Sequence, residues 1–287
     1  MKKRKGRLAD LQSGLSVLLS RALGRIAAAE LPRPVLATTI IAYSLVYGVD
    51  LADAVEPTSG FKRLDEFFAR RIDPGLRPIC ADSDALISPV DGTLLGFGNC
   101  SREGGKRLEI KGELYDICQL VGRDPGGEEP NPSGGFAVFY LHPRDCHRVQ
   151  VPADCFLEEV RHIPGARFPV ASWFEFCADE IYARNERLVF DFETPGGGRL
   201  SLVMVAALGV GNIDSQYSPI ALDDKPSTLR FDAPPDLHRG DDLASFRLGS
   251  TVVLLWSKAA VDLDENLAPG AVIIGQKLGE LRSRHDV

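Results

Sequence analysis

The sequence predicts an α+β protein, with a β-rich core of mostly antiparallel strands behind N-terminal amphipathic helices. The chain has 287 residues, 44% hydrophobic and 25% charged, which is enough to bury a large core. From about Leu86 onward, short β-branched and aromatic runs alternate with Gly and Pro, as strands and turns do. Before that point the apolar residues follow helical spacing. We therefore expect an N-terminal helical, membrane-associating region at residues 1–80 and a β-rich domain at residues 81–287.

Three helices are predicted in the N-terminal region. Residues 9–29 place leucines on one side and serines on the other, as an amphipathic helix does. Residues 34–48 contain no charge, but these 15 residues fall short of the roughly 20 that a membrane-spanning helix needs. This second helix is therefore expected to be buried or interfacial. Residues 60–72 place one leucine and three phenylalanines on one side, which indicates a third amphipathic helix.

In the second region, Gly- and Pro-rich segments predict the loops, and the apolar runs between them predict the strands. Residues 121–135 and 214–242 are polar and rich in Pro or Gly, so both are predicted to be loops. The predicted strands are the runs TLLGFG, GGFAVFYL, RLVFDFET, RLSLVMVAALGVGNI, STVVLLW and GAVIIGQKLG.

The charge distribution excludes one class of partner and suggests another. The chain has 40 acidic and 33 basic residues, and a net charge of −7 argues against a nucleic-acid-binding protein. The first seven residues, MKKRKGR, nevertheless contain five Lys or Arg. Such a basic tip is suited to an anionic membrane surface, or it is a solvated tail.

The cysteines and the N-terminus indicate a cytoplasmic setting. Six cysteines are scattered without a CxxC pair, so neither a metal site nor a redox motif is predicted. Arg21 and Arg25 interrupt the apolar run after the basic tip, and no signal peptide is evident.

Three stretches contain polar residues that strand formation does not require. SPVDG places Asp91 in a turn, for which a simple Asp-Gly turn is sufficient. YLHPRDCHRVQVP places His142 and His147 close to an Asp and an Arg at a strand end, which indicates a functional polar cluster, although a single His is usually structural. The third stretch is the triplet Gly249-Ser250-Thr251, for which a β-bulge is the simplest explanation.

Together these stretches resemble the phosphatidylserine decarboxylase family, whose members process themselves and carry a pyruvoyl group. FKRLDEFFARRIDPGLRPI is similar to the helix that leads into the family's core, SPVDG to its Asp-Gly turn and YLHPRDCHRVQVP to its histidine segment. YARNERLVF, VAALGVGNI, FRLGST and IGQKLG then follow in the family's order. The resemblance covers nearly the whole chain, and the ordered set is far more specific than any single piece.

The resemblance implies that Ser250 becomes the cofactor, a covalent pyruvoyl (pyruvate) group. The Ser250 hydroxyl would attack the carbonyl of Gly249, and the chain would be cut between residues 249 and 250. Glycine leaves that carbonyl unshielded and tolerates the strained backbone that the attack requires. The ketone would then condense with the substrate amine and accept electrons as carbon dioxide leaves. Thr251 could donate a hydrogen bond to a developing charge or serve only as a strand residue.

One position departs from the family's pattern. His147 matches the family's first histidine, which implies that it donates the final proton, since an imidazole titrates near neutrality. Gln150 replaces the second histidine, the base that activates the serine. Glutamine cannot hold a proton, so processing would slow by roughly 10²- to 10⁴-fold unless another group substitutes. The alternatives are His142 as the base, Asp91 acting through water, and a Gln150 that only orients Ser250.

The function implied by the resemblance is conversion of phosphatidylserine to phosphatidylethanolamine at the cytoplasmic face of the cell membrane, by a peripheral protein. The expected partners are a phospholipid substrate and the membrane surface, with no nucleic acid and no metal. The two fragments would form a heterodimer, or a homodimer of such heterodimers. The alternatives are a decarboxylase of a soluble amino acid on the same scaffold and an unprocessed, inactive homologue that binds lipid or another partner.

Overall fold

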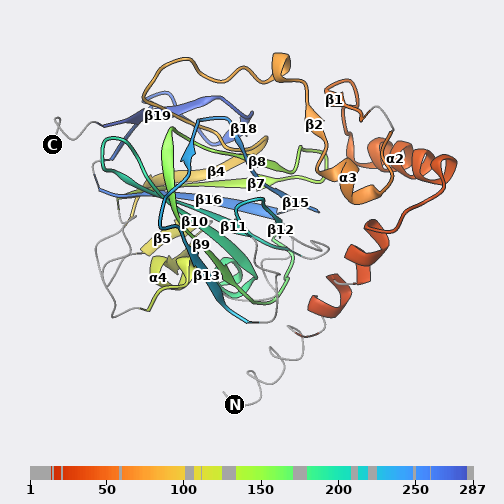
Figure 1. Cartoon of the computed structure of the whole chain (residues 1–287), viewed down its shortest axis with the longest axis horizontal. Helices are drawn as coiled ribbons and strands as arrows, with labels where there is room; N and C mark the ends of the chain where they lie inside the picture. Colours follow the sequence, from red (N-terminus) through yellow and green to blue (C-terminus); the bar gives the residue numbers. More distant parts are fainter. Residues whose placement is uncertain are drawn as a thin grey trace.

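The helices of the N-terminal region lie at one side of a large sheet in the computed structural model (Figure 1). The structure describes residues 14, 16–20, 22–57, 60–100, 107–110, 112–124, 134–170, 180–207, 213–218, 225–247, 250–258 and 260–282. Residues 16–20 and 22–27 are helical, in agreement with part of the predicted helix at 9–29, whose first turns lie outside the described residues.

Helix α2 (Arg33–Tyr47) forms where the uncharged second segment was predicted to be helical. It ends at Gly48, whose φ of 71° is the left-handed conformation that glycine adopts most easily. Only two of its side chains, Leu36 and Ser44, are buried, and Leu45 is 80% exposed. Of the two predicted environments, burial is therefore wrong for most of this helix. Among the described residues, no helix is both long and apolar enough to cross a membrane.

The third predicted helix, at residues 60–72, is much shorter than expected. Helix α3 (Leu64–Phe68) has five residues, and the chain then enters strand β2 (Arg71–Ile72), which pairs with β1 (Ala54–Val55). A 3₁₀ turn, η1 (Pro74–Leu76), follows, with the Asp73 side chain accepting a hydrogen bond from the Gly75 amide. The prediction of a continuous helix here is wrong because strand pairing extends the chain after Phe68.

The largest sheet is nine-stranded, and its strands pair antiparallel throughout the described residues. Its order is β13 (Ser227–Arg230), β9 (Cys155–Ile163), β10 (Arg187–Glu193), β11 (Arg199–Val205), β16 (Ser250–Trp256), β7 (Gly135–Leu141), β4 (Gly92–Asn99) and β18 (Gly270–Val272), with β14 (Asp236–Leu237) also on β9. The predicted α+β class with mostly antiparallel strands is confirmed. The predicted loop at 214–242 is wrong in part, because β13 and β14 lie within it.

Smaller elements surround this sheet. One three-stranded sheet is β12 (Ile213–Asp214), β15 (Asp242–Phe246) and β8 (Arg148–Gln150), and another is β17 (Val261–Leu263), β19 (Lys277–Leu281) and β3 (Ala85–Ile87). The remaining elements are the β5 (Arg107–Ile110) and β6 (Glu113–Asp116) hairpin and the short helices α4 (Ile117–Val121) and α5 (Ile181–Arg184).

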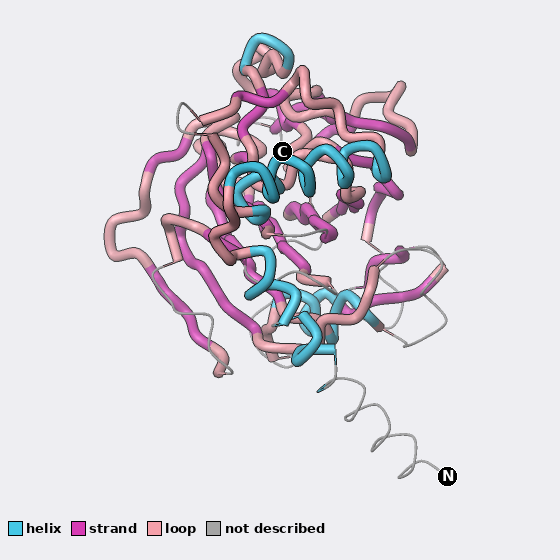
Figure 2. The backbone as a smooth tube through the Cα atoms, turned by 90° about the vertical axis from the view of Figure 1, so that its right-hand side faces the viewer, coloured by secondary structure: helices cyan, strands magenta, loops and turns pink. Residues whose placement is uncertain are grey.

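Strand β16 is a continuous apolar run because it lies in the middle of the core. It pairs with β7 on one side and β11 on the other, and its residues from Thr251 to Trp256 are all buried. A strand covered on both faces needs apolar residues at every position rather than alternating ones. Figure 2 shows the sheet strongly curved, with the N-terminal helices beside it.

Gly92 permits β4 to lie close to β7. A Cβ at this position would lie 2.5 Å from the Tyr140 carbonyl oxygen, whereas a Cβ at Gly96, in the same strand, would meet nothing within 4 Å. We expect Gly92→Ala to lower the free energy of unfolding by roughly 2 kcal/mol and Gly96→Ala to change it by less than about 0.5 kcal/mol. Urea unfolding measures both, and equal destabilisation by the two variants would contradict this account.

Candidate active site

Strand register brings three of the predicted site residues to one end of the large sheet. Ser250, the first residue of β16, pairs with Leu141, the last residue of β7. On the other side of β7, a Cβ on Gly92 would lie 3.7 Å from the Leu141 Cα. The residues next in the chain to Gly92 and Leu141 at this end are Asp91 and His142. Asp91, His142 and the Ser250 backbone therefore lie at the ends of three neighbouring strands, on the same edge of the sheet.

The chain passes from one sheet to another between Phe246 and Ser250. Strand β15 ends at Phe246 in the three-stranded sheet, and β16 begins at Ser250 in the large sheet. This crossing between the two sheets therefore ends at the serine that opens the apolar run. Gly249 lies outside the described residues.

A backbone hydrogen bond places His147 next to the start of this crossing. The Phe246 amide donates a hydrogen bond to the His147 carbonyl at 2.9 Å, so the histidine lies beside the end of β15. Its ring is fully buried and contacts the Phe68 ring edge-on, with 6.1 Å between centroids. The segment after β7 therefore places His147 under α3, at the end of β15 that leads to Ser250.

The hydrogen bonds of His147 define its tautomer. Its Nδ1 lies 2.9 Å from the Asp145 carbonyl oxygen, which can only accept, so Nδ1 carries the proton. Its Nε2 is buried and has no hydrogen-bond partner among the described residues. Burial, with a smaller effect of Arg70, lowers the pKa of His147 to about 4. The expectation that this imidazole titrates near neutrality is therefore wrong: it is neutral at pH 7 and presents a free lone pair.

His142 has the opposite arrangement. The Arg144 amide donates to His142 Nδ1 at 3.3 Å, so in the neutral ring the proton is on Nε2. Partial burial, together with Arg144, lowers the pKa of His142. The Asp145 carboxylate accepts from the His142 backbone amide at 2.8 Å rather than from its ring. The basic nitrogen of His142 is therefore already occupied.

Asp91 is held by a cation and an amide. Arg77 Nε lies 3.0 Å from both carboxylate oxygens of Asp91, and Arg77 Nη2 lies 3.0 Å from Asp53. The Ile274 amide donates to Asp91 at 2.8 Å. Both carboxylate oxygens of Asp91 are thus already engaged by Arg77, and one of them also accepts from the Ile274 amide.

Thr251 and Gln150 have buried side-chain atoms without a hydrogen-bond partner among the described residues. Thr251 pairs with Tyr140 in β7, and its hydroxyl is buried with no hydrogen-bond partner among the described residues. The side-chain oxygen of Gln150 is also buried and unpartnered, while its backbone amide donates to Pro89. Unpaired buried polar atoms are rare in folded proteins, and they mark positions where a further polar group fits.

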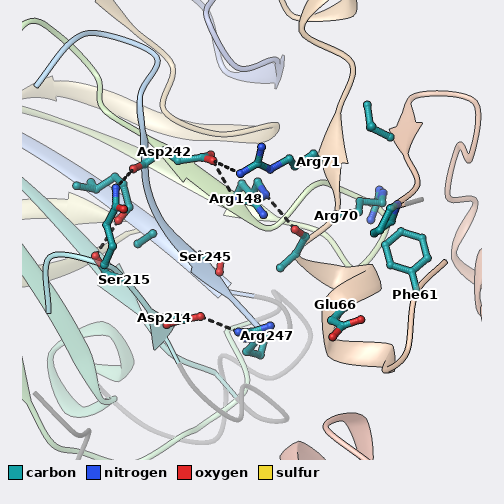
Figure 3. Close-up of a pocket in the computed structure, with 16 residues that line it drawn as sticks. Phe61, Glu66, Arg70, Arg71, Arg148, Asp214, Ser215, Asp242, Ser245 and Arg247 are labelled. Carbon is teal, nitrogen blue, oxygen red and sulfur yellow. Dashed lines mark hydrogen bonds and ion pairs between the residues drawn. The ribbon is translucent and has the colours of Figure 1, made fainter. Parts of the chain in front are cut away.

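A cavity of about 630 Å³ opens between the α3 segment and β15 (Figure 3). Arg70 and Arg71 contribute to one wall, and Ser245 and Arg247, which lead toward Ser250, to another. Neither Arg70 nor Arg77 is predicted from the sequence, because nothing in FFARRIDPGLRP distinguishes a buried arginine from an exposed one. Among the described residues, no three His, Cys, Asp or Glu side chains come together as a metal site.

Comparison with known proteins gives matches over most of the chain. Residues 64–280 match the profile of a family described as phosphatidylserine decarboxylase. The chain is 34% identical to the phosphatidylserine decarboxylase proenzyme of Pseudomonas fluorescens over 241 residues, covering 81% of this chain and 83% of that protein. It is 32% identical to the proenzyme of the same description from Marinobacter nauticus, and 34% to that from Azotobacter vinelandii. Each of these two alignments covers 92% of this chain and 93% of the relative.

The antiparallel core, the polar strand ends and these matches define a decarboxylase, so the chain is an enzyme. It belongs to the phosphatidylserine decarboxylase family, and the resemblance predicted from its ordered motifs is confirmed.

The buried, neutral His147 predicts an acid-sensitive fold. Its native pKa of about 4 lies below the ordinary value of 6.5, so the unfolded chain binds more protons between these pH values. The stability that this group contributes is complete above pH 6.5 and is lost as the pH falls toward 4. We expect the free energy of unfolding to fall between pH 7.5 and 5 by roughly 2 kcal/mol more than in a His147→Gln variant.

Urea unfolding of both proteins in a Ser250→Ala background measures this difference without a backbone cut. Parallel pH profiles for the two proteins would show that His147 titrates normally.

Proposed function

We propose that this chain converts phosphatidylserine to phosphatidylethanolamine after cutting itself between Gly249 and Ser250. The observation that carries the proposal is the membership of the family, in a chain whose Ser250 begins a strand beside the histidine segment. The word proenzyme in the relatives' names supports a maturation step. The same comparisons do not favour a decarboxylase of soluble amino acids.

Maturation is a transfer of the acyl group from nitrogen to oxygen. The Ser250 hydroxyl oxygen bonds to the Gly249 carbonyl carbon, its proton passes to a base, and the Gly249–Ser250 amide bond becomes an ester. Loss of the Ser250 α-proton then expels the Gly249 carboxylate from Cβ and separates residues 1–249 from residues 250–287. Water finally replaces the nitrogen of residue 250, which leaves as ammonia.

We assign the base of the first step to His147. It is neutral at pH 7, and the lone pair on its Nε2 has no hydrogen-bond partner among the described residues. His142 and Asp91 are weaker candidates, since the Nδ1 of His142 accepts from Arg144 and the Asp91 carboxylate is paired with Arg77. In this chain one histidine thus takes the serine proton that a second histidine takes elsewhere in the family. Asp91 is then a positioning residue that fixes the turn at the strand edge.

The Thr251 hydroxyl fits the group that maturation would create. It is buried with no hydrogen-bond partner among the described residues, directly follows residue 250 and can donate to a pyruvoyl oxygen, whereas the Gln150 side-chain oxygen can only accept. A pyruvoyl group at residue 250 would supply the ketone that withdraws electrons as the substrate loses carbon dioxide. Because His147 is unprotonated at rest, the proton that it returns to the substrate carbon must be taken up within the reaction cycle.

Membrane association is proposed to depend on α2. Its exposed side chains include Val35, Ile41, Leu45 and Val46, an apolar surface that burial in the protein does not explain. Such a helix can lie in the membrane interface. The basic N-terminal residues, which lie outside the described part of the chain, would add attraction to anionic lipids.

The intact mass of the purified protein tests the cut. We expect fragments of residues 1–249 and 250–287, while Ser250→Ala stays a single chain because it has no hydroxyl to attack the carbonyl. A cut at another position, or cleavage of the alanine variant, would show that another residue is the precursor. Release of carbon dioxide from phosphatidylserine, but not from free amino acids, tests the substrate.

A time course of cleavage tests the base. His147→Gln should slow cleavage by roughly 10²- to 10⁴-fold, the usual contribution of a positioned base. The matched variant His142→Gln should cleave within a few-fold of the natural rate. Rapid cleavage by His147→Gln, or a block confined to His142→Gln, would exclude this assignment.

Flotation with anionic liposomes tests the membrane surface. The double variant Ile41→Glu/Leu45→Glu places two charges on the exposed surface of α2, and we expect at least about tenfold weaker binding, because burying each side chain contributes about 1.5–3 kcal/mol. Lys258→Glu changes the net charge by the same amount at an exposed site at the far end of β16 and should bind nearly as the natural chain does. Equal losses in both variants would indicate a general charge effect instead.

A further inference from the structure

Arg70 is a buried cation with unused donors. Its side chain belongs to a residue that is only 4% exposed, and its Nη2 donates to the Arg144 carbonyl at 2.8 Å. Its Nε and Nη1 are buried with no hydrogen-bond partner among the described residues. The guanidinium lies over the Phe67 ring, 5.1 Å from the centroid. A buried charge with two orphaned donors is costly unless an anion completes it.

The other arginines that line the 630 Å³ cavity are already paired. Arg71 and Arg148 lie 3.5 and 3.1 Å from the Asp242 carboxylate. Arg247 lies 2.6 Å from Asp214. A dashed line in Figure 3 marks this ion pair. Within the described lining of this cavity, Arg70 is the arginine without a carboxylate partner.

We propose that Arg70 binds the phosphodiester of the substrate's headgroup, an inference that rests on the proposed phosphatidylserine decarboxylase function. A guanidinium stays charged and has five N–H donors in one plane, each of which can donate a charge-assisted hydrogen bond to a phosphate oxygen. The unused Nε and Nη1 of Arg70 are two such donors, which point to different sides of the guanidinium.

The reaction favours the phosphate over the serine carboxylate as the ligand. The carboxylate must leave as neutral carbon dioxide, so a cation that holds it would stabilise the ground state and oppose the reaction. The phosphodiester keeps its charge throughout, and a cation bound to it opposes no step. Arg70 is therefore assigned to the part of the substrate that does not react.

The position of Arg70 fits this assignment. Arg70 lies two residues after Phe68, the last residue of α3, whose ring packs on His147. The charge of Arg70 also acts on the His147 ring. Ser245 and Arg247 line the same cavity only a few residues before Ser250. A headgroup held at Arg70 thus lies beside both the histidine and the crossing that leads to residue 250.

Binding of a soluble headgroup to the Ser250→Ala chain tests the proposal without requiring cleavage or turnover. Calorimetry should show sn-glycero-3-phosphoserine bound at least about tenfold more weakly by Arg70→Met, because a charge-assisted hydrogen bond is lost. The matched variant Arg230→Met, whose side chain is 76% exposed and lies outside the cavity, should bind within twofold of the parent. Arg70→Lys keeps the charge and should give an intermediate loss.

Two further ligands separate the possible sources of the anion. Inorganic phosphate should bind more weakly than the headgroup but with the same dependence on Arg70, whereas L-serine, which has a carboxylate and no phosphate, should not depend on Arg70. Headgroup affinity within twofold of the parent in both Arg70 variants would overturn the proposal. So would an equal dependence of L-serine binding on Arg70.

Kinetics of the mature enzyme give an independent readout. Because the phosphodiester is bound equally in the ground state and the transition state, Arg70→Lys should raise KM for phosphatidylserine about three- to tenfold with kcat, per mature chain, unchanged. A fall in kcat at constant KM would place Arg70 in the chemical step instead. Loss of carbon dioxide release with headgroup binding intact would count against the proposed function and not against this site.

Discussion

The position of the candidate site depends on how Trp256 fits against Gly135 at the far end of β16. A Cβ on Gly135 would lie 2.5 Å from the indole nitrogen of Trp256, so only glycine leaves room for that ring. The Gly134 amide also donates to the Trp256 carbonyl at 2.8 Å. Because β16 is apolar on both faces, its hydrophobic pattern alone does not define its register. The glycine and the indole do, and with seven residues paired to β7 they place Ser250 opposite Leu141.

The sequence predicted the elements that local chemistry determines. The Pro-led, uncharged segment forms α2, and the apolar run after the Gly-Ser step forms β16. The prediction of the third helix was wrong beyond Phe68, because distant residues bind the carbonyl groups that a longer helix would use. Arg148 Nε donates to the Ala69 carbonyl at 3.0 Å, and Cys146 Sγ donates to the Arg70 carbonyl at 3.3 Å. Strand β13 was missed for a related reason. Its residues, STLR, have no hydrophobic pattern typical of a strand. They form one because their backbone pairs with the edge of β9.

The candidate site could be located from the sequence, but its chemistry could not be assigned there. The motifs identified both histidines, yet their different hydrogen bonds arise from a carbonyl at one ring and an amide at the other. That difference decides which nitrogen is basic, and spacing alone does not contain it. Arg70 is even less predictable from the sequence. FFARRI contains two adjacent arginines, of which Arg70 is buried and Arg71 is mostly exposed. Burial and missing partners, which distinguish the two, are properties of the folded chain.

Arg70 and His147 are coupled electrostatically, and that coupling bears on how one histidine could serve two steps. Burial is the main reason that the pKa of His147 falls to about 4, and the positive charge of Arg70 lowers it further. Both effects keep the ring neutral in the unprocessed chain, as a base for maturation must be. A phosphodiester bound to Arg70 would cancel that positive charge and so raise the pKa of His147. Because burial has the larger effect, the imidazole remains neutral with the headgroup bound, and the proton that it returns to the substrate carbon is taken up within the reaction cycle.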